Sequence, residues 1–264
     1  MKLEVIRKGE RSQVCQAPLL FVHGAWHGAW CWDEYFLDYF ARLGYECIAP
    51  SLRGHGGSPG VAKMNLYRIA DYVEDVASIA ASLDTPPIVI GHSMGGLVTQ
   101  HYLAQHPATA GVLLGSVPPG GIKGVVMSML KHHPLRFMIA NLSWNLHLLV
   151  NTPAKARALF YSSAVSEADV ERFAHRLTNE SYLAFIDMLL LDLPKRAAVK
   201  VPLKVIGGEL DTIFPPADVQ ATAEFYNSVA KIYSDTAHNL MLEPHWKEIA
   251  DDIHGWIQAA VVGW

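Results

Sequence analysis

The clearest chemical feature of the sequence is a serine in the pattern Gly91-His92-Ser93-Met94-Gly95. This pattern follows the apolar run Ile88–Ile90 and precedes a helix-like stretch that begins at Met94. GxSxG between a strand and a helix is typical of a nucleophile elbow, a sharp turn that exposes the serine Oγ and needs small residues on both sides. The helix N-terminus behind the serine favours developing negative charge. We therefore predict that Ser93 is a nucleophile.

A nucleophilic serine needs a general base, because its hydroxyl is barely ionised at neutral pH. The chain has 13 histidines. His238 follows the strand-like run Lys231–Tyr233 and precedes the last helix-like segment, which is where a strand-end loop should carry the base. His92 belongs to the elbow itself, and we expect its side chain to point away from Ser93. We predict that His238 is the base.

The base in turn needs a carboxylate that orients it and stabilises its charged form. Asp211 comes shortly after the strand-like run Leu203–Ile206, and it gives the chain order serine, acid, histidine that this arrangement requires. We predict that Asp211 is the acid and that Glu209 is the fallback. The other two competitors are Asp218 and Asp235, and Asp235 is expected to cap a turn.

Two backbone N–H groups should stabilise the oxyanion that forms when a serine attacks a carbonyl. The N–H of Met94, immediately after the nucleophile, is the first predicted donor. The N–H of Ala25 is the second, because it lies in the loop after the apolar run Leu19–Val22, where Gly24 allows a tight turn.

Alternating strand-like and helix-like segments must position these groups. Apolar runs of three to six residues alternate with segments of helical periodicity, which indicates βαβ units and a mostly parallel sheet with helices on both faces. The strand ends then share one edge, where ligands bind. The expected strands are Leu19–Val22, Cys47–Ala49, Ile88–Ile90, Val112–Val117, Leu203–Ile206 and Lys231–Tyr233; the expected helices are Glu34–Leu43, Leu66–Leu83, Met94–Gln105 and Trp246–Ala259.

Residues 118–194 interrupt this alternation with helix-like segments alone, and we call them the cap. We predict an α/β core of residues 1–117 and 195–264, with the cap inserted between the sixth and seventh strands. The expected cap helices are 122–149, 153–162, 167–178 and 181–191. The apolar cap residues either line an apolar pocket or bury the cap on the sheet; they are Met127, Met129, Leu130, Phe137, Met138, Ile139, Leu142, Trp144 and Leu148. The basic cluster 131–133 with Arg136 is expected to be a solvated face.

Composition excludes several classes of protein. The 264 residues are 51% hydrophobic and 17% charged, unlike a disordered chain. A net charge of −4 argues against a nucleic-acid binder. Three scattered cysteines (Cys15, Cys31 and Cys47) predict neither a disulfide framework nor a metal site. The sequence shows no signal-peptide pattern, no membrane-spanning run and no cofactor motif, so we expect a soluble, cytoplasmic protein without cofactor or metal.

Two further segments are rich in glycine and histidine, namely His23–Trp32 (HGAWHGAWCW) and Arg53–Ser58 (RGHGGS). Together with the elbow and the Asp211 and His238 loops, they resemble the α/β-hydrolase superfamily, which implies an α/β-hydrolase fold. The first segment is similar to plant methylesterases and hydroxynitrile lyases, but those lyases carry Thr in place of Gly24 and Lys in place of Asn239. The second segment is similar to that of the general bacterial α/β-hydrolases, although Ser51 stands where those proteins usually have Asp. Arg53 is expected to be structural.

The sequence thus predicts a serine hydrolase of the carboxylesterase or lipase type, acting on a small-molecule ester with an apolar part through an acyl-enzyme. A thioesterase, a lactonase, a C–C bond hydrolase and a perhydrolase use the same fold, and a non-catalytic receptor could retain it. Dehalogenases and epoxide hydrolases are disfavoured, because they carry Asp where this chain has Ser93.

Overall fold

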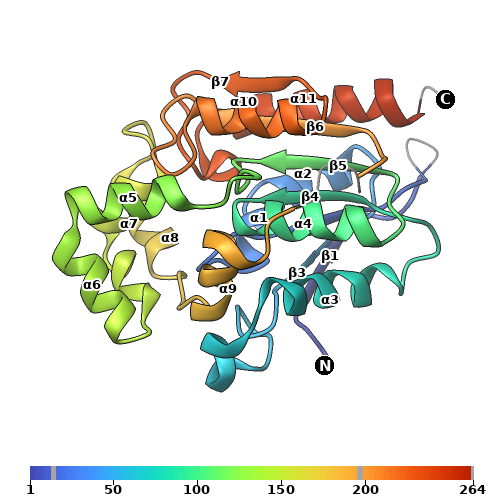
Figure 1. Cartoon of the computed structure of the whole chain (residues 1–264). Helices are drawn as coiled ribbons and strands as arrows, with labels where there is room; N and C mark the ends of the chain where they lie inside the picture. The colour runs from blue at the N-terminus through green and yellow to red at the C-terminus, as the bar shows by residue number, and fades with distance from the viewer. Residues whose placement is uncertain (13–15, 195–198, 263–264) are drawn as a thin grey trace.

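A computed structural model describes residues 1–12, 16–194 and 199–262 (Figure 1). Seven strands of these residues form one sheet in the order β1-β3-β2-β4-β5-β6-β7. Strands β2 to β7 run parallel and β1 is antiparallel to β3, which confirms the predicted mostly parallel sheet. The strands are β1 (Val5–Lys8), β2 (Leu19–Val22), β3 (Cys47–Pro50), β4 (Ile88–His92), β5 (Ala110–Leu114), β6 (Leu203–Gly208) and β7 (Ala230–Tyr233).

Strand β1 is an element that the hydrophobic pattern did not predict. Its sequence, VIRK, carries two charged residues and is only partly buried. It lies at the edge of the sheet, where charged side chains are common because they discourage pairing with another chain. The central strands β2, β4 and β5 are buried throughout, as continuous apolar runs in a parallel sheet should be.

Helices cover both faces of the sheet (Figure 1). Helix α3 packs against α4, and α2 packs against α11. Helix α11 is amphipathic, with Ile249, Ile253 and Ile257 buried four residues apart. The core helices are α1 (Trp30–Asp33), α2 (Phe36–Arg42), α3 (Ile69–Ala80), α4 (Met94–Gln105), α10 (Pro216–Phe225) and α11 (Trp246–Ile257), with short helical turns η1 (Val61–Leu66), η5 (Leu240–Leu242) and η6 (Gln258–Val262).

The cap follows β5 and precedes β6, so it is inserted after the fifth strand and the predicted position between the sixth and seventh strands is wrong. Four of the five strands before the cap are the expected apolar runs, and the fifth is β1 at the edge of the sheet. Among the described residues, no sixth strand precedes the cap. The predicted boundary at residue 195 lies outside the described residues, and the division into core and cap stays a prediction.

The cap consists of short helices gathered at the ends toward which the parallel strands point (Figure 1). The helix expected over residues 122–149 is divided at Pro134, because proline has no N–H to donate and clashes with the preceding turn. The cap elements are α5 (Lys123–His132), α6 (Pro134–Leu142), η2 (Leu146–Leu149), α7 (Pro153–Phe160), α8 (Glu167–Ala174), α9 (Tyr182–Ile186) and η3 (Asp187–Leu191). Among the residues described, none of the helices combines the length and the apolar character that crossing a bilayer requires.

Candidate active site

Ser93 lies in the turn between β4 and α4, with φ 54° and ψ −120°. Positive φ is rare for a residue with a side chain, and it aims the Ser93 Oγ away from both the strand and the helix. The turn is held because Ser93 N–H donates to the Leu114 carbonyl at 3.1 Å. A side chain at position 95 would collide with the backbone carbonyl oxygens of Val22 and His23, so the elbow requires Gly95.

The structure brings Ser93, His238 and Asp211 into a hydrogen-bonded chain. Ser93 Oγ lies 2.9 Å from His238 Nε2. His238 Nδ1 lies 2.7 Å from Asp211 Oδ2, and since a carboxylate accepts, Nδ1 carries the proton and Nε2 accepts from the serine. All three residues are buried. Asp211 Oδ1 accepts from the N–H groups of Ile213 and Phe214, which fix the carboxylate in place.

The competing acids lie elsewhere. Glu209 and Asp235 are exposed, and Asp235 occupies a turn with φ 52°. Asp218 is half-buried, and burial together with the nearby Asp211 carboxylate raises its pKa. Of the four acids weighed, Asp211 is the one that bonds His238.

His92 has a place in the site that sequence reasoning missed. Its Nε2–H donates to the backbone carbonyl of His238 at 2.9 Å, and the two rings lie 4.8 Å apart. His92 therefore fixes the loop that carries the predicted base. Its position directly before the nucleophile was the one signal available in the sequence.

Three buried histidines of this region are neutral near pH 7, and two of them, His27 and His92, lie near His238. Burial lowers the pKa of His23, His27 and His92, that of His27 to about 4. His27 Nδ1–H donates to the Ala25 carbonyl at 2.7 Å, and its Nε2 accepts from Asn239. Positive charge that develops on His238 therefore meets no like charge from these rings.

The two predicted oxyanion donors, Ala25 and Met94, line the same cavity as Ser93. Neither N–H donates a hydrogen bond to another of the described residues, as a group reserved for a ligand should be. The loop around Ala25 is fixed by its own bonds, since His27 N–H donates to the Gly24 carbonyl at 3.3 Å.

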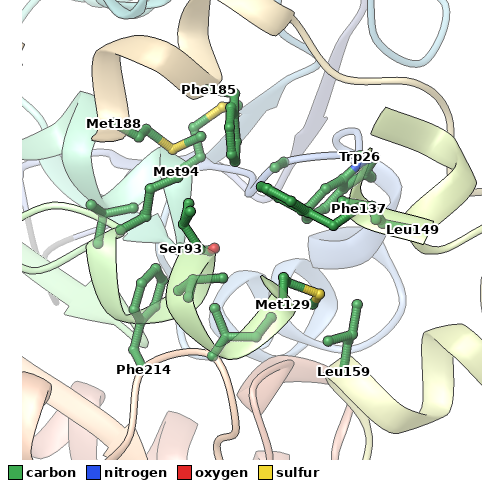
Figure 2. Close-up of a pocket in the computed structure, with 16 residues that line it drawn as sticks. Trp26, Ser93, Met94, Met129, Phe137, Leu149, Leu159, Phe185, Met188 and Phe214 are labelled. Carbon is green, nitrogen blue, oxygen red and sulfur yellow. The ribbon is translucent and has the colours of Figure 1, made fainter. Parts of the chain in front are cut away.

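An apolar cavity opens over Ser93 between the core and the cap (Figure 2). Phe137 and Met129 line it, whereas Trp144 is 44% exposed and stacks on Tyr182 outside it. The remaining lining residues are Trp26, Val117, Ile122, Val125, Val126, Leu149, Leu159, Phe185, Met188, Ile213 and Phe214. Several apolar cap residues instead face solvent, namely Met127, Leu130, Met138, Ile139 and Leu142.

A second, more polar hollow adjoins this cavity and shares Val125, Met129, Leu159 and Ile213 with it. It is also lined by Ser128, His132, His133, Arg136, Lys155, Ala158 and Thr212. Part of the basic cluster thus lines this second hollow, while Lys131, His132 and His133 are exposed to solvent, as expected for a solvated face.

Cys31 and Cys47 are buried free thiols, and burial raises the pKa of both. Cys15 lies outside the described residues. Within the described part of the chain, no group of three or more His, Cys, Asp or Glu side chains is placed to hold a metal ion.

Residues 19–252 match the model of the Alpha/beta hydrolase family. A monoacylglycerol lipase of Mycolicibacterium smegmatis is 28% identical over 83% of this chain and 80% of its own. A bifunctional esterase/perhydrolase of Acinetobacter calcoaceticus is 33% identical over 40% of each chain. A solved carboxylesterase structure from Nitrososphaera gargenis superposes with a TM-score of 0.74 at 21% identity, over 99% of this chain and 96% of the other.

Proposed function

This chain belongs to the Alpha/beta hydrolase family, and we propose that it hydrolyses carboxylic esters with an apolar part, using Ser93, His238 and Asp211 as its catalytic triad. The single observation that carries the proposal is the hydrogen-bonded chain from Ser93 Oγ through His238 to Asp211 beneath an apolar cavity. The relatives named as esterases and a lipase support the same class of reaction.

In the first half of the reaction, Ser93 Oγ attacks the ester carbonyl carbon while its proton passes to His238 Nε2. The N–H groups of Ala25 and Met94 hold the oxygen that becomes negatively charged. Asp211 stabilises the imidazolium. The tetrahedral intermediate then collapses, the C–O bond breaks, and the alcohol leaves with the proton from His238 Nε2.

In the second half, a water molecule attacks the acyl-enzyme. His238 takes a proton from that water, the same two N–H groups hold the oxyanion, and Ser93 leaves with the proton returned. The products are a carboxylic acid and an alcohol, and the enzyme is regenerated without a cofactor.

The apolar cavity should bind the acyl chain of the ester. Burial of each methylene contributes about 0.8 kcal/mol, so kcat/KM should rise about fourfold per methylene until the cavity is full. The adjoining hollow with Arg136, Lys155 and Thr212 offers polar side chains to the alcohol part. Monoacylglycerols combine an acyl chain with a polar alcohol, and they are the finer substrate class that we propose.

The test is a panel of p-nitrophenyl esters of increasing chain length, with monoacylglycerols, thioesters and lactones alongside. Ser93→Ala and His238→Ala should each lower kcat by several orders of magnitude, because triad members act as a unit. Near wild-type esterase activity in purified Ser93→Ala would remove Ser93 from the mechanism. Failure of the wild-type protein to react with a fluorophosphonate would favour a non-catalytic receptor.

A further inference from the structure

A buried carboxylate of the cap lies against the loop that carries Ala25. Glu180 is 1% exposed, and it lies between α8 and α9, far along the chain from this loop. Its Oε2 accepts from the backbone N–H of Trp26, the residue after Ala25, at 3.2 Å. The Glu180 carboxylate is therefore buried next to the oxyanion loop, although it is not part of the proposed triad.

The other contacts of Glu180 come from the core as well as the cap. Its Oε2 lies 3.0 Å from His55 Nε2, and its Oε1 accepts from the Tyr72 hydroxyl at 2.8 Å. Its Oε1 also accepts from the N–H of Ser181 at 2.6 Å. Burial alone would raise the pKa of Glu180, but His55 and these donors together hold it below its ordinary value, so the group is a carboxylate at neutral pH.

A second hydrogen bond from the cap holds the backbone carbonyl of Trp26. The Trp26 carbonyl accepts from Thr178 N–H at 2.9 Å, so cap residues two apart bond the N–H and the C=O of Trp26. Trp26 has φ 65°, a conformation that a residue with a side chain rarely adopts unless its surroundings impose it. These two bonds provide that constraint, and they fix the chain direction directly after Ala25.

We propose that Glu180 is a positioning residue for catalysis, which holds the Trp26 N–H so that the adjacent Ala25 N–H points at the oxyanion. The proposal rests on the proposed function. The cap then does more than select substrates, because one of its side chains keeps an oxyanion donor in place. The alternative is that Glu180 only fastens the cap to the core.

Asp187 offers a matched control for that alternative. It is also a buried cap carboxylate that bonds the core, where it accepts from Arg68 and from the backbone N–H of Ile69 at 3.1 Å. Its partners lie at the start of α3 and not in the Ala25 loop. Loss of either carboxylate should weaken the attachment of the cap, whereas loss of Glu180 alone should disturb the oxyanion donor.

The kinetic experiment compares Glu180→Ala and Glu180→Gln with Asp187→Ala and Asp187→Asn. Removal of an oxyanion donor costs about 10²–10³ in kcat, so partial misplacement in Glu180→Ala should cost about 10- to 100-fold, with KM changed by less than about threefold. Glu180→Gln should be intermediate, because an amide nitrogen cannot accept from Trp26 N–H or Ser181 N–H. The Asp187 variants should keep kcat within about twofold.

A transition-state analogue separates positioning from simple attachment. An alkyl trifluoromethyl ketone forms a hemiketal with Ser93 whose oxygen occupies the oxyanion position. Its inhibition constant should rise in Glu180→Ala by the same factor by which kcat/KM falls, while the affinity for the corresponding alkyl alcohol should stay unchanged. The Asp187 variants should alter neither.

Deuterium exchange of the peptide covering residues 23–28 gives a readout that does not depend on activity. The Trp26 N–H should exchange faster in the Glu180 variants than in the wild type or the Asp187 variants. Slow exchange in all variants, or kcat unchanged in a folded Glu180→Ala, would overturn the proposal; if that variant does not fold, unchanged kcat and exchange in Glu180→Gln would do so. Full activity in Ser93→Ala would instead refute the proposed function, and the exchange result would still show whether Glu180 holds the loop.

Discussion

Substitution of alanine for Gly24 should misplace the nucleophile without removing any reacting group. Gly24 precedes the predicted oxyanion donor Ala25, and its Cα faces the elbow. A Cβ at this position would lie 2.9 Å from Ser93 Cβ and 2.8 Å from His92 Nδ1. The threonine that the resembling lyases carry here would add the same Cβ and two further atoms, so this elbow and this loop are fitted to glycine.

The size of the effect follows from these distances. Carbon atoms in contact prefer a separation of about 3.5–4.0 Å, so either the loop or Ser93 must move by roughly 0.6–1.1 Å. A displacement of about 1 Å in a reacting group can lower the rate about 100-fold. Overpacking a well-filled site also costs about 1–3 kcal/mol of unfolding free energy.

The assay is kcat on the best p-nitrophenyl ester, with urea denaturation of the same variant. Gly255→Ala is the control, because nothing lies within 4 Å of a Cβ added there in α11. That control should keep kcat and gain about 0.5–1 kcal/mol of stability, since alanine is the better helix former. Wild-type kcat together with wild-type stability in Gly24→Ala would show that the loop and the elbow are not packed as described.

Three other changes test the triad, the cavity and the buried histidines. Asp211→Asn should lower kcat by about 10³–10⁴-fold by stabilising the wrong tautomer of His238, whereas kcat of Asp218→Asn should stay within about threefold of the wild type. A larger loss in Asp218→Asn than in Asp211→Asn would show that Asp211 is not the triad acid. Phe137→Ala should flatten the dependence of kcat/KM on acyl chain length and the exposed Trp144→Ala should not, with fluorophosphonate labelling of Ser93 as the check that chemistry is intact. Because burial lowers the pKa of His27 to about 4, the unfolded chain binds this proton more tightly than the folded one. The contribution of His27 to the unfolding free energy should therefore be fully present above about pH 6.5 and fall by about 3 kcal/mol toward pH 4, in addition to the losses from the buried His23 and His92. A pH dependence equally steep in His27→Gln would contradict this assignment.

Features with a local cause could be predicted from the sequence. Strand β2 and helix α4 have the predicted bounds, because a continuous apolar run and a helix that starts at the nucleophile are set by neighbouring residues. Ser93, Asp211 and His238 were chosen by their positions after strands, and parallel strands place such positions at one edge.

Features that depend on distant contacts could not be predicted. Glu180 meets His55 across 125 residues, and no pattern around either residue indicates that pairing. Phe137 and Trp144 are both apolar residues of the cap, but Trp144 follows α6 with φ 51° and turns onto Tyr182. Which of the two faces the cavity is decided by how the helices pack and not by their composition.

At Ser93, the positive φ lowers the stability of the fold, while the serine side chain is needed for the proposed reaction. A residue with a side chain in such a sparsely populated conformation costs about 1–3 kcal/mol, and only tight surroundings can keep it there. Glycine would adopt the same turn without that penalty, so stability alone favours the residue that cannot react. A search for more heat-resistant variants that does not also screen for activity should therefore accumulate inactive chains with glycine at this position, and such a loss of function would be a sign of relieved strain rather than of a damaged fold.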